Sequence, residues 1–225
     1  MTVRVFASAA EPGPLLLDAE ESHYLVRVRR ARPGASIEVL NPAGGGWRAD
    51  VEVADAKRAQ VVLRERLAPR PPWPIDLAVA LPETKAANEV IARATESGAR
   101  SLTFLETEHS QPGRLNPERI ERVIAAARRQ CGRLDPLPIV GPVPLYTWLE
   151  SPRTGFVASL ASDPGRGPST GAPDVLIGPE GGLHPDEEHA ALAGGLVPLS
   201  LGPYILRTEV AVTAALAIVG TISPL

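Results

Sequence analysis

The chain has 225 residues, of which 44% are hydrophobic and 22% are charged, and its formal net charge at pH 7 is −3. This composition excludes a wholly disordered chain and a strongly basic protein that coats nucleic acid without specificity. The single cysteine, Cys131, excludes an intramolecular disulfide and a zinc site built from cysteines. The sequence has no long apolar run, and its start lacks the apolar core of a signal peptide, so we expect a soluble cytoplasmic protein.

The first 70 residues are predicted to form a small β-barrel. Short β-rich segments alternate with proline and glycine turns, and one helix over residues 19–31 interrupts them. The strands are predicted at residues 3–6, 36–40, 47–53 and 60–67. The next segment, Ala68–Pro74, contains four prolines, which can neither continue a helix nor sit in a central strand. We therefore place a domain boundary there, with one domain at residues 1–70 and another at residues 71–225.

The second domain is predicted to be an α/β domain. Its strands are continuously apolar and alternate with helices, which is typical of a parallel sheet that is covered on both faces. Strands are expected at residues 75–81, 102–105, 156–160, 175–177 and 197–201, and helices at residues 85–97, 117–131, 185–192 and 208–218.

Two segments of this domain share one design, in which an apolar strand runs into a glycine turn and then into a helix. They are Asp174–Glu188 and Val197–Ala211. Ligands of open parallel sheets lie beyond the carboxyl ends of the strands, and both turns fall at that edge. Glycine backbone there could bind the edge of an adenine-like ring, with Leu201, Ile205 and Leu206 as an apolar wall. The plainer alternative is a pair of ordinary strand–helix connections.

Several other kinds of site are disfavoured. The sequence contains no GxxxxGKS/T phosphate loop, no GxGxxG after a strand and no GxSxG nucleophile turn. His184 and His189 are five residues apart, which puts them on different faces of a helix and argues against a zinc pair.

The residues of the two turns resemble a known family. Ile177–Gly182, followed by Leu201–Glu209, is similar to the paired motifs of the bacterial 16S ribosomal RNA uridine N3-methyltransferases, which belong to the knotted SPOUT class. The resemblance covers nearly the whole chain, with supporting matches at Ser22–Val28, Arg30, Glu96–Gly98, Glu108–Ser110 and Gln130–Arg133. The sequence departs from the family pattern at Val210, Arg129, Asn88 and Ser97, where the family usually has threonine, glutamate, an acidic residue and leucine.

The resemblance implies both a fold and an activity. The fold would be α/β, with a C-terminal SPOUT methyltransferase domain that contains a trefoil knot and a small N-terminal PUA-like β-barrel that binds RNA. The enzyme would be a homodimer with its active site near the subunit interface, and would need no metal and no membrane. It would use S-adenosyl-L-methionine to methylate N3 of a specific uridine in the 16S ribosomal RNA of the small subunit.

Roles for individual residues follow from this reading. The cofactor is expected to contact Leu160, Ile177, Gly178, Pro179, Glu180, Gly181, Gly182, Ser200, Leu201, Gly202, Ile205 and Leu206. Neutral uridine carries a proton on N3, so catalysis needs a cation near uracil O2 or O4 and an acceptor for that proton. Arg207 is the predicted cation; the alternative is that it forms an ion pair with Glu180 or Glu209. Glu209 is predicted either to accept the proton or to orient Arg207. RNA contacts are expected from Arg4, Arg27, Arg29 and Arg30.

Three other functions stay open at this level. A ribose 2′-O-methyltransferase would share the knotted fold, because the glycine turns serve the cofactor and not the methyl acceptor. The departures at Val210 and Arg129 give some weight to a non-catalytic RNA-binding assembly factor that kept the fold. A metal hydrolase is the third alternative.

Overall fold

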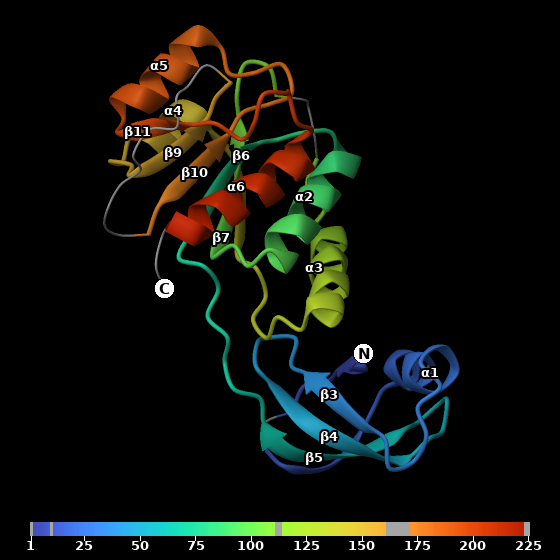
Figure 1. The fold of residues 1–225 in the computed structure, drawn as a ribbon. Helices are drawn as coiled ribbons and strands as arrows, with labels where there is room; N and C mark the ends of the chain where they lie inside the picture. The colour runs from blue at the N-terminus through green and yellow to red at the C-terminus, as the bar shows by residue number, and fades with distance from the viewer. Residues whose placement is uncertain (1, 10, 111–113, 161–171, 223–225) are drawn as a thin grey trace. The chain divides into compact units, whose positions relative to one another are not determined.

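The computed structural model describes residues 2–9, 11–110, 114–160 and 172–222, and it divides into two compact units (Figure 1). The first unit comprises Met1–Pro71 together with Arg128–Pro136, and the second comprises Pro72–Ala127 and Leu137–Leu225. The short segment 128–136 therefore belongs with the N-terminal unit, although it comes much later in the chain. Among the helices of the described residues, none has both the length and the apolar character that crossing a bilayer requires.

The first unit is built on a five-stranded sheet with the strand order β1-β3-β4-β5-β2. β1 runs parallel to β3, and all the other neighbouring strands are antiparallel. Its elements are β1 (Arg4–Phe6), β2 (Gly13–Leu16), α1 (Ala19–His23), the π-helical turn η1 (Tyr24–Val28), β3 (Ser36–Leu40), β4 (Gly46–Val53) and β5 (Gln60–Arg66). Alternate strand residues such as Val39, Ala49 and Val61 pack with Leu25 into one buried core.

The helix predicted over residues 19–31 is only partly α-helical. The carboxylate of Asp18 caps α1 by accepting the backbone N–H of Glu21 at 2.8 Å. From Tyr24 the turns widen, and the N–H of Arg29 donates to the carbonyl oxygen of Tyr24 at 2.9 Å. The wider turns rotate Val28 away from the face that holds Leu25, so Val28 is 57% exposed. The prediction of one continuous helix over residues 19–31 was therefore wrong in its second half.

Segment 128–136 is anchored in the first unit by two arginines. Arg128 is 2% exposed, and its guanidinium donates to the carbonyl oxygens of Asn41 and Pro42 at 2.8 and 2.9 Å. Arg129 donates twice to the carboxylate of Glu21, at 3.1 and 2.5 Å, and lies 4.3 Å from the ring centre of Tyr24. Arg129, one of the departures from the family pattern, thus has its own partners within this unit.

The second unit contains a six-stranded parallel sheet with the order β11-β9-β10-β6-β7-β8. Its elements are β6 (Asp76–Ala80), α2 (Thr84–Glu96), β7 (Ser101–Glu106), α3 (Pro117–Cys131), β8 (Ile139–Pro144), α4 (Leu145–Leu149), β9 (Gly155–Ala158), β10 (Asp174–Ile177), α5 (Pro185–Ala193), β11 (Leu196–Leu199) and α6 (Thr208–Ile222). α3 ends within segment 128–136 of the first unit.

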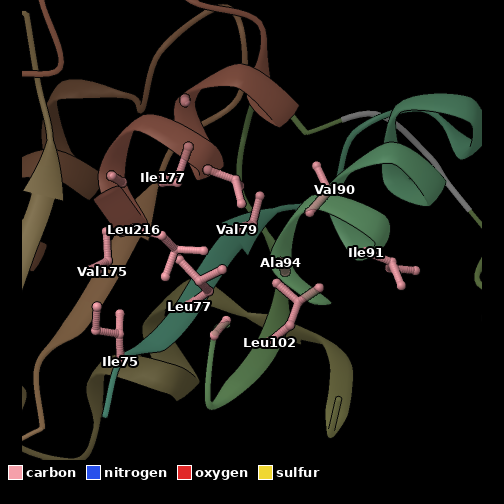
Figure 2. Packing of buried hydrophobic residues seen from close by; sticks show 14 of the residues in the cluster. Ile75, Leu77, Val79, Val90, Ile91, Ala94, Leu102, Val175, Ile177 and Leu216 are labelled. Carbon is pink, nitrogen blue, oxygen red and sulfur yellow. The ribbon is translucent and has the colours of Figure 1, made fainter. Parts of the chain in front are cut away.

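Helices cover both faces of this sheet. On one face, Leu77 and Val79 of β6 pack with Val90 of α2 and Leu216 of α6 (Figure 2). On the other face, Ala78 packs with residues of α4 and α5. Consecutive residues of β6 therefore point into different buried layers, which explains why this strand is apolar throughout. The predicted α/β domain with a parallel sheet is confirmed.

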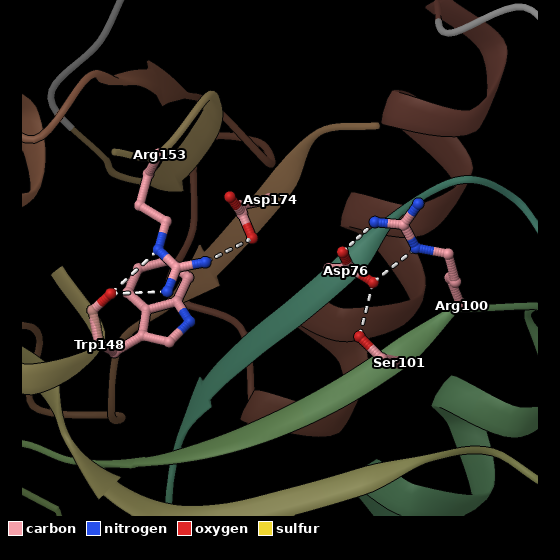
Figure 3. Close-up of polar contacts among 6 residues, drawn as sticks. All are labelled: Asp76, Arg100, Ser101, Trp148, Arg153 and Asp174. Carbon is pink, nitrogen blue, oxygen red and sulfur yellow. Dashed lines mark hydrogen bonds and ion pairs between the residues drawn. The ribbon is translucent and has the colours of Figure 1, made fainter. Parts of the chain in front are cut away.

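Two half-buried carboxylates lie side by side at the amino ends of the central strands. Asp76 of β6 and Asp174 of β10 are direct neighbours in the ladder, and each has its own arginine (Figure 3). Asp76 accepts hydrogen bonds from Arg100 and from the hydroxyl of Ser101, the latter at 2.6 Å. Asp174 has a looser ion pair with Arg153, at 3.6 Å.

These environments move the two pKa values in opposite directions. Burial opposes ionisation of Asp76, but the hydrogen bonds from Arg100 and Ser101 outweigh it and lower the pKa of this carboxyl below its usual value. Burial raises the pKa of Asp174, and the charge of Arg153 offsets only part of that effect. Both carboxylates lie at the edge of the sheet opposite to the glycine turns, so we assign them to stability.

Asp76→Asn should lower the free energy of unfolding at pH 7 by about 2 kcal/mol, the typical worth of hydrogen bonds to a charged group. The contribution of Asp76 is complete at neutral pH and is lost as the pH falls through its lowered pKa, so the difference from wild type should shrink in acid. The contribution of Asp174 depends on pH with the opposite sign. The fold favours the protonated form of Asp174, and this stabilisation is lost as the pH rises through its raised pKa. Asp174→Asn should therefore cost less than half as much at pH 7. Urea unfolding at pH 7 and pH 3.5 measures the free energy of unfolding of the two variants. Equal losses of stability in Asp76→Asn and Asp174→Asn at pH 7 would contradict this account.

Candidate active site

One cavity of about 340 Å³ opens at the carboxyl ends of β9, β10 and β11. Three loops line it: residues 158–160 after β9, 177–183 after β10 and 201–206 after β11. Glu188 of α5 and Ala211 of α6 complete the wall. The two glycine turns, which are separated in sequence by α5 and β11, thus face the same space, at the edge where parallel sheets bind ligands.

The turn after β10 is tightly closed. The N–H of Gly182 donates to the carbonyl oxygen of Pro179 at 2.8 Å, and Gly182 has a left-handed φ of 79°. The carbonyl oxygen of Gly182 in turn accepts a hydrogen bond from Nδ1 of His109 at 3.1 Å. His109 belongs to the loop that follows β7, so the turn is supported from outside the cavity.

A buried glutamate fixes the start of α5 beyond this turn. Glu187 is 4% exposed, and its carboxylate accepts the backbone N–H groups of His184 and Glu108 at 2.9 and 2.8 Å. His184 caps the helix by accepting the N–H of Asp186 on its ring nitrogen at 3.3 Å. His184 is thus the N-cap residue of α5. Over the described residues, no group of three or more His, Cys, Asp or Glu side chains is placed to hold a metal ion.

The turn after β11 presents an apolar wall. Gly202 has a φ of 128°, and a Cβ added there would meet no atom of the described residues within 4 Å. Leu201 and Leu206 pack partly against the core, whereas Tyr204 and Ile205 are 78% and 71% exposed. The loop therefore offers open, apolar surface beside a backbone without side-chain obstruction.

The cavity carries negative charge and no positive charge within the described residues. Its lining includes the carboxylates of Glu180 and Glu188 but no lysine, arginine or histidine. The hydroxyl of Ser159 donates to Oε1 of Glu188 at 2.9 Å. A ligand that is partly apolar and carries a positive charge suits this lining.

Arg207 and Glu209 lie next to the cavity but not in its wall. Arg207 is exposed just before α6, and its carbonyl oxygen accepts the N–H groups of Val210 and Ala211 at 3.0 and 2.9 Å. Its guanidinium has no hydrogen bond or ion pair with any described residue, so the alternative ion pair with Glu180 or Glu209 is not formed there. Glu209 is half-buried in the first turn of α6.

Comparisons with known proteins identify the family. Residues 69–220 match the model of an RNA methyltransferase domain, and residues 17–64 match that of an RNA methyltransferase PUA domain. The ribosomal RNA small subunit methyltransferase E of Synechocystis sp. is 33% identical over 216 residues, which cover 89% of this chain and 71% of that protein. The chain belongs to the ribosomal RNA small subunit methyltransferase E family. The resemblance that the sequence motifs indicate is thereby confirmed.

Solved structures agree with this membership of the methyltransferase E family. A Legionella pneumophila protein, solved in complex with its bound cofactor SAM, is 28% identical with a TM-score of 0.81, and the match covers 99% of this chain and 98% of that one. The methyltransferase E of Neisseria gonorrhoeae, bound to S-adenosyl methionine, matches over the same shares with a TM-score of 0.83 and 22% identity, and so speaks for the fold alone. The mixed α/β methyltransferase fold with a PUA domain is confirmed.

In the present chain, a member of the methyltransferase E family, eleven of the twelve residues that the sequence assigns to the cofactor line the cavity. The exception is Ser200, whose hydroxyl accepts the N–H of Gly202 at 3.4 Å. The lining residues outside that prediction are Ala158, Ser159, Leu183, Glu188, Tyr204 and Ala211. Ala158 ends the apolar strand β9 and Ser159 follows it, at the same edge of the sheet. The rule that ligands lie beyond the carboxyl ends of parallel strands would therefore have predicted both residues. No sequence signal marks Glu188 or Ala211.

The four arginines assigned to RNA differ in their surroundings. Arg27 and Arg30 are exposed, and Arg29 is half-buried. Arg30 also has a φ of 56°, which is uncommon for a residue with a side chain. Arg4 is held inside the unit, where it donates to Glu38 at 2.6 Å and to the carbonyl oxygens of Arg129 and Gln130. We therefore leave Arg4 out of the RNA surface proposed below.

Proposed function

We propose that this chain methylates N3 of a specific uridine in the 16S ribosomal RNA of the small subunit, with S-adenosyl-L-methionine as the methyl donor. The observation that carries the proposal is that both glycine turns of the family motif line a single cavity at the carboxyl edge of the parallel sheet. The membership of the methyltransferase E family supports the same reaction class.

The cavity fits the cofactor in size and chemistry. Its volume of about 340 Å³ lies within the range of small-molecule sites. The Leu201 and Leu206 side chains can cover an adenine ring, and the bare backbone at Gly202 allows close approach. The carboxylates of Glu180 and Glu188 suit a cationic ligand. When bound, S-adenosylmethionine supplies a methyl group that its positively charged sulfur makes electrophilic.

The protein's own residues must deal with the proton on uridine N3. Arg207 is exposed, without a partner among the described residues, and directly follows the cavity residue Leu206. Its guanidinium would donate hydrogen bonds to O2 or O4 of the uracil and stabilise the negative charge left when N3 loses its proton. Glu209, two residues on, would accept that proton or orient Arg207.

The architecture of the proposed enzyme has further parts. Residues 1–70 would form a PUA-like β-barrel that binds RNA, and residues 71–225 a SPOUT domain with a trefoil knot. The knot rests on the resemblance to the SPOUT class; in the structure the chain leaves β11 at one edge of the sheet and continues to α6, which packs beside α2 (Figure 1). Exposed apolar side chains of Leu160, Tyr204 and Ile205 at the cavity support a homodimer whose interface adjoins the active site. We place the enzyme in the cytoplasm.

The proposal is tested by nucleoside mass spectrometry of ribosomal RNA incubated with S-adenosylmethionine, with and without the protein. Naked 16S RNA and assembled small subunits from cells lacking the activity serve as substrates. We expect 3-methyluridine to appear only with the protein. A 2′-O-methylated nucleoside instead would assign the other knotted reaction, and no new methylated nucleoside on either substrate would refute the proposal.

Arg27→Glu combined with Arg30→Glu should weaken binding of small-subunit RNA about tenfold or more and reduce the steepness of its salt dependence. Each arginine that neutralises a phosphate contributes roughly one to the magnitude of the slope of log affinity against log salt concentration. Replacing both arginines should therefore reduce the magnitude of this slope by about two. Filter binding between 50 and 300 mM salt measures it. Arg64→Glu with Arg122→Glu, at two exposed positions, is the charge-matched control. Equal losses in both double variants would mean that only net charge matters.

A further inference from the structure

Glu188 contributes a carboxylate to the cavity wall, and a neighbouring hydroxyl holds it. The Ser159 side chain donates to Oε1 of Glu188 at 2.9 Å, which links α5 to the loop after β9. Ser159 is itself fixed to β11, because its backbone N–H donates to the carbonyl oxygen of Leu199 at 3.0 Å. The carboxylate thus has a defined position within the wall and is half-buried there.

Within the part of the chain that the structure describes, no other side chain uses the remaining acceptor sites of this carboxylate. An ionised carboxylate has two oxygens and about four lone-pair sites, and the serine occupies one of them. No other side chain among the described residues donates to Glu188, and no cation lines the cavity. Glu180, the other carboxylate of the lining, is exposed in the glycine turn. A partly buried carboxylate with spare acceptor sites forms its strongest hydrogen bonds with polarised O–H or N⁺–H donors.

We propose that Glu188, oriented by Ser159, binds a donor group of the cofactor and is a specificity-determining residue of this cavity. The inference rests on the proposed function, since it takes S-adenosylmethionine as the ligand. That molecule offers two groups of the required chemistry, the ribose hydroxyls and the ammonium of its amino acid part. Both donate to a carboxylate, and the cavity wall supplies Glu188 as the fixed acceptor.

Isothermal titration calorimetry of the full chain tests the assignment with three probes. S-adenosylmethionine carries both donor groups, whereas 5′-methylthioadenosine has the ribose hydroxyls but no ammonium. Glu188→Gln should weaken binding of S-adenosylmethionine about tenfold, because the side-chain volume is kept and the charge is lost. Ser159→Ala should weaken it about threefold, because the carboxylate stays but loses its orientation. An equal loss for both ligands assigns the nucleoside part that they share, and a loss for S-adenosylmethionine that S-adenosylhomocysteine, with its uncharged sulfur, also shows assigns the ammonium; either result supports the proposal. A loss confined to S-adenosylmethionine would come from its sulfonium charge and would overturn the assignment to a donor group.

The control is Asp186→Asn, which removes one carboxylate from the same helix at a side chain that is 85% exposed and lies outside the cavity wall. It should bind both ligands as the wild type does. Thermal unfolding of each variant checks that the fold is intact, and Glu188→Ala gives a second substitution at the same position. Wild-type affinity for both ligands in Glu188→Gln and Glu188→Ala would overturn the role of Glu188 while leaving the proposed function intact. Failure of the wild-type protein to bind either ligand would instead refute the proposed cofactor, and this assignment with it.

Discussion

Gly202→Val should reduce the affinity for S-adenosylmethionine at least about 100-fold, while the unfolding temperature stays within a few degrees of the wild type. Gly202 has a φ of 128°, a region that β-branched residues avoid at a cost of roughly 1–3 kcal/mol. The added side chain would also stand in the loop that lines the cavity. Since about 1.4 kcal/mol corresponds to a tenfold change in affinity, obstruction of the ligand that costs about 3 kcal/mol accounts for the expected loss, whereas the backbone strain lowers only the stability of the fold.

The matched control for this substitution is Gly34→Val in the first unit. Gly34 also has a positive φ, 84°, and a Cβ added there would meet no atom within 4 Å. It should strain its own turn without changing cofactor affinity, as calorimetry and circular dichroism of both variants can show. Gly181, which the motif alone suggests as a target, is a weaker choice, because an added Cβ would only touch the Cβ of His109 at 3.8 Å. Undiminished binding by Gly202→Val would remove the cofactor from this cavity.

Arg207→Ala should lower kcat for RNA methylation by about 10²–10³ and leave the Kd for S-adenosylmethionine within about twofold. Removal of one donor that stabilises a developing negative charge typically has an effect of this size on kcat. The cofactor affinity should hold because Arg207 does not line the cavity. Arg207→Lys should have a kcat between those of the wild type and Arg207→Ala, since lysine keeps the positive charge but lacks the planar, forked donor group of arginine.

Single-turnover methylation with saturating RNA, together with cofactor calorimetry, separates these effects. Arg122→Ala is the control, because Arg122 is exposed on α3 and pairs only loosely with Glu118 at 3.8 Å. A variant with normal kcat but weak cofactor binding would make Arg207 a binding residue. Normal values of both would remove it from the reaction.

The sequence was informative wherever a strand is continuously apolar. The parallel strands β6, β7, β9, β10 and β11 were all expected, because strands buried on both faces have an unmistakably apolar pattern. The strands that were missed, β2 with Gly-Pro at its start and β8 with Gly-Pro in its middle, lie at the edges of their sheets. An edge strand tolerates proline, which has no backbone N–H. The Gly-Pro pairs in these two strands therefore resemble the sequence of a turn.

The site was harder to derive than the sheet that holds it. The motifs indicate the backbone of two loops, but the third loop after β9 carries no motif, and Glu188 enters the cavity from a helix whose other residues are structural. The tertiary packing that brings α5 over β9 decides which of its side chains reach the ligand. Likewise, the partners of Arg129 are more than 100 residues away in the chain, so only the folded structure shows what the arginine contacts at this position, where the family usually has a glutamate.

The anchoring of residues 128–136 sets a limit on how this protein can be cut into pieces. A fragment ending at residue 70 would lose Arg129 and leave the carboxylate of Glu21, only 7% exposed in the intact chain, buried without its partner. It would also lose Arg128, the donor to two backbone carbonyls near residue 41. An N-terminal fragment that folds independently therefore needs this late segment supplied as well, by a linker that bypasses the second unit or as a separate peptide added in trans.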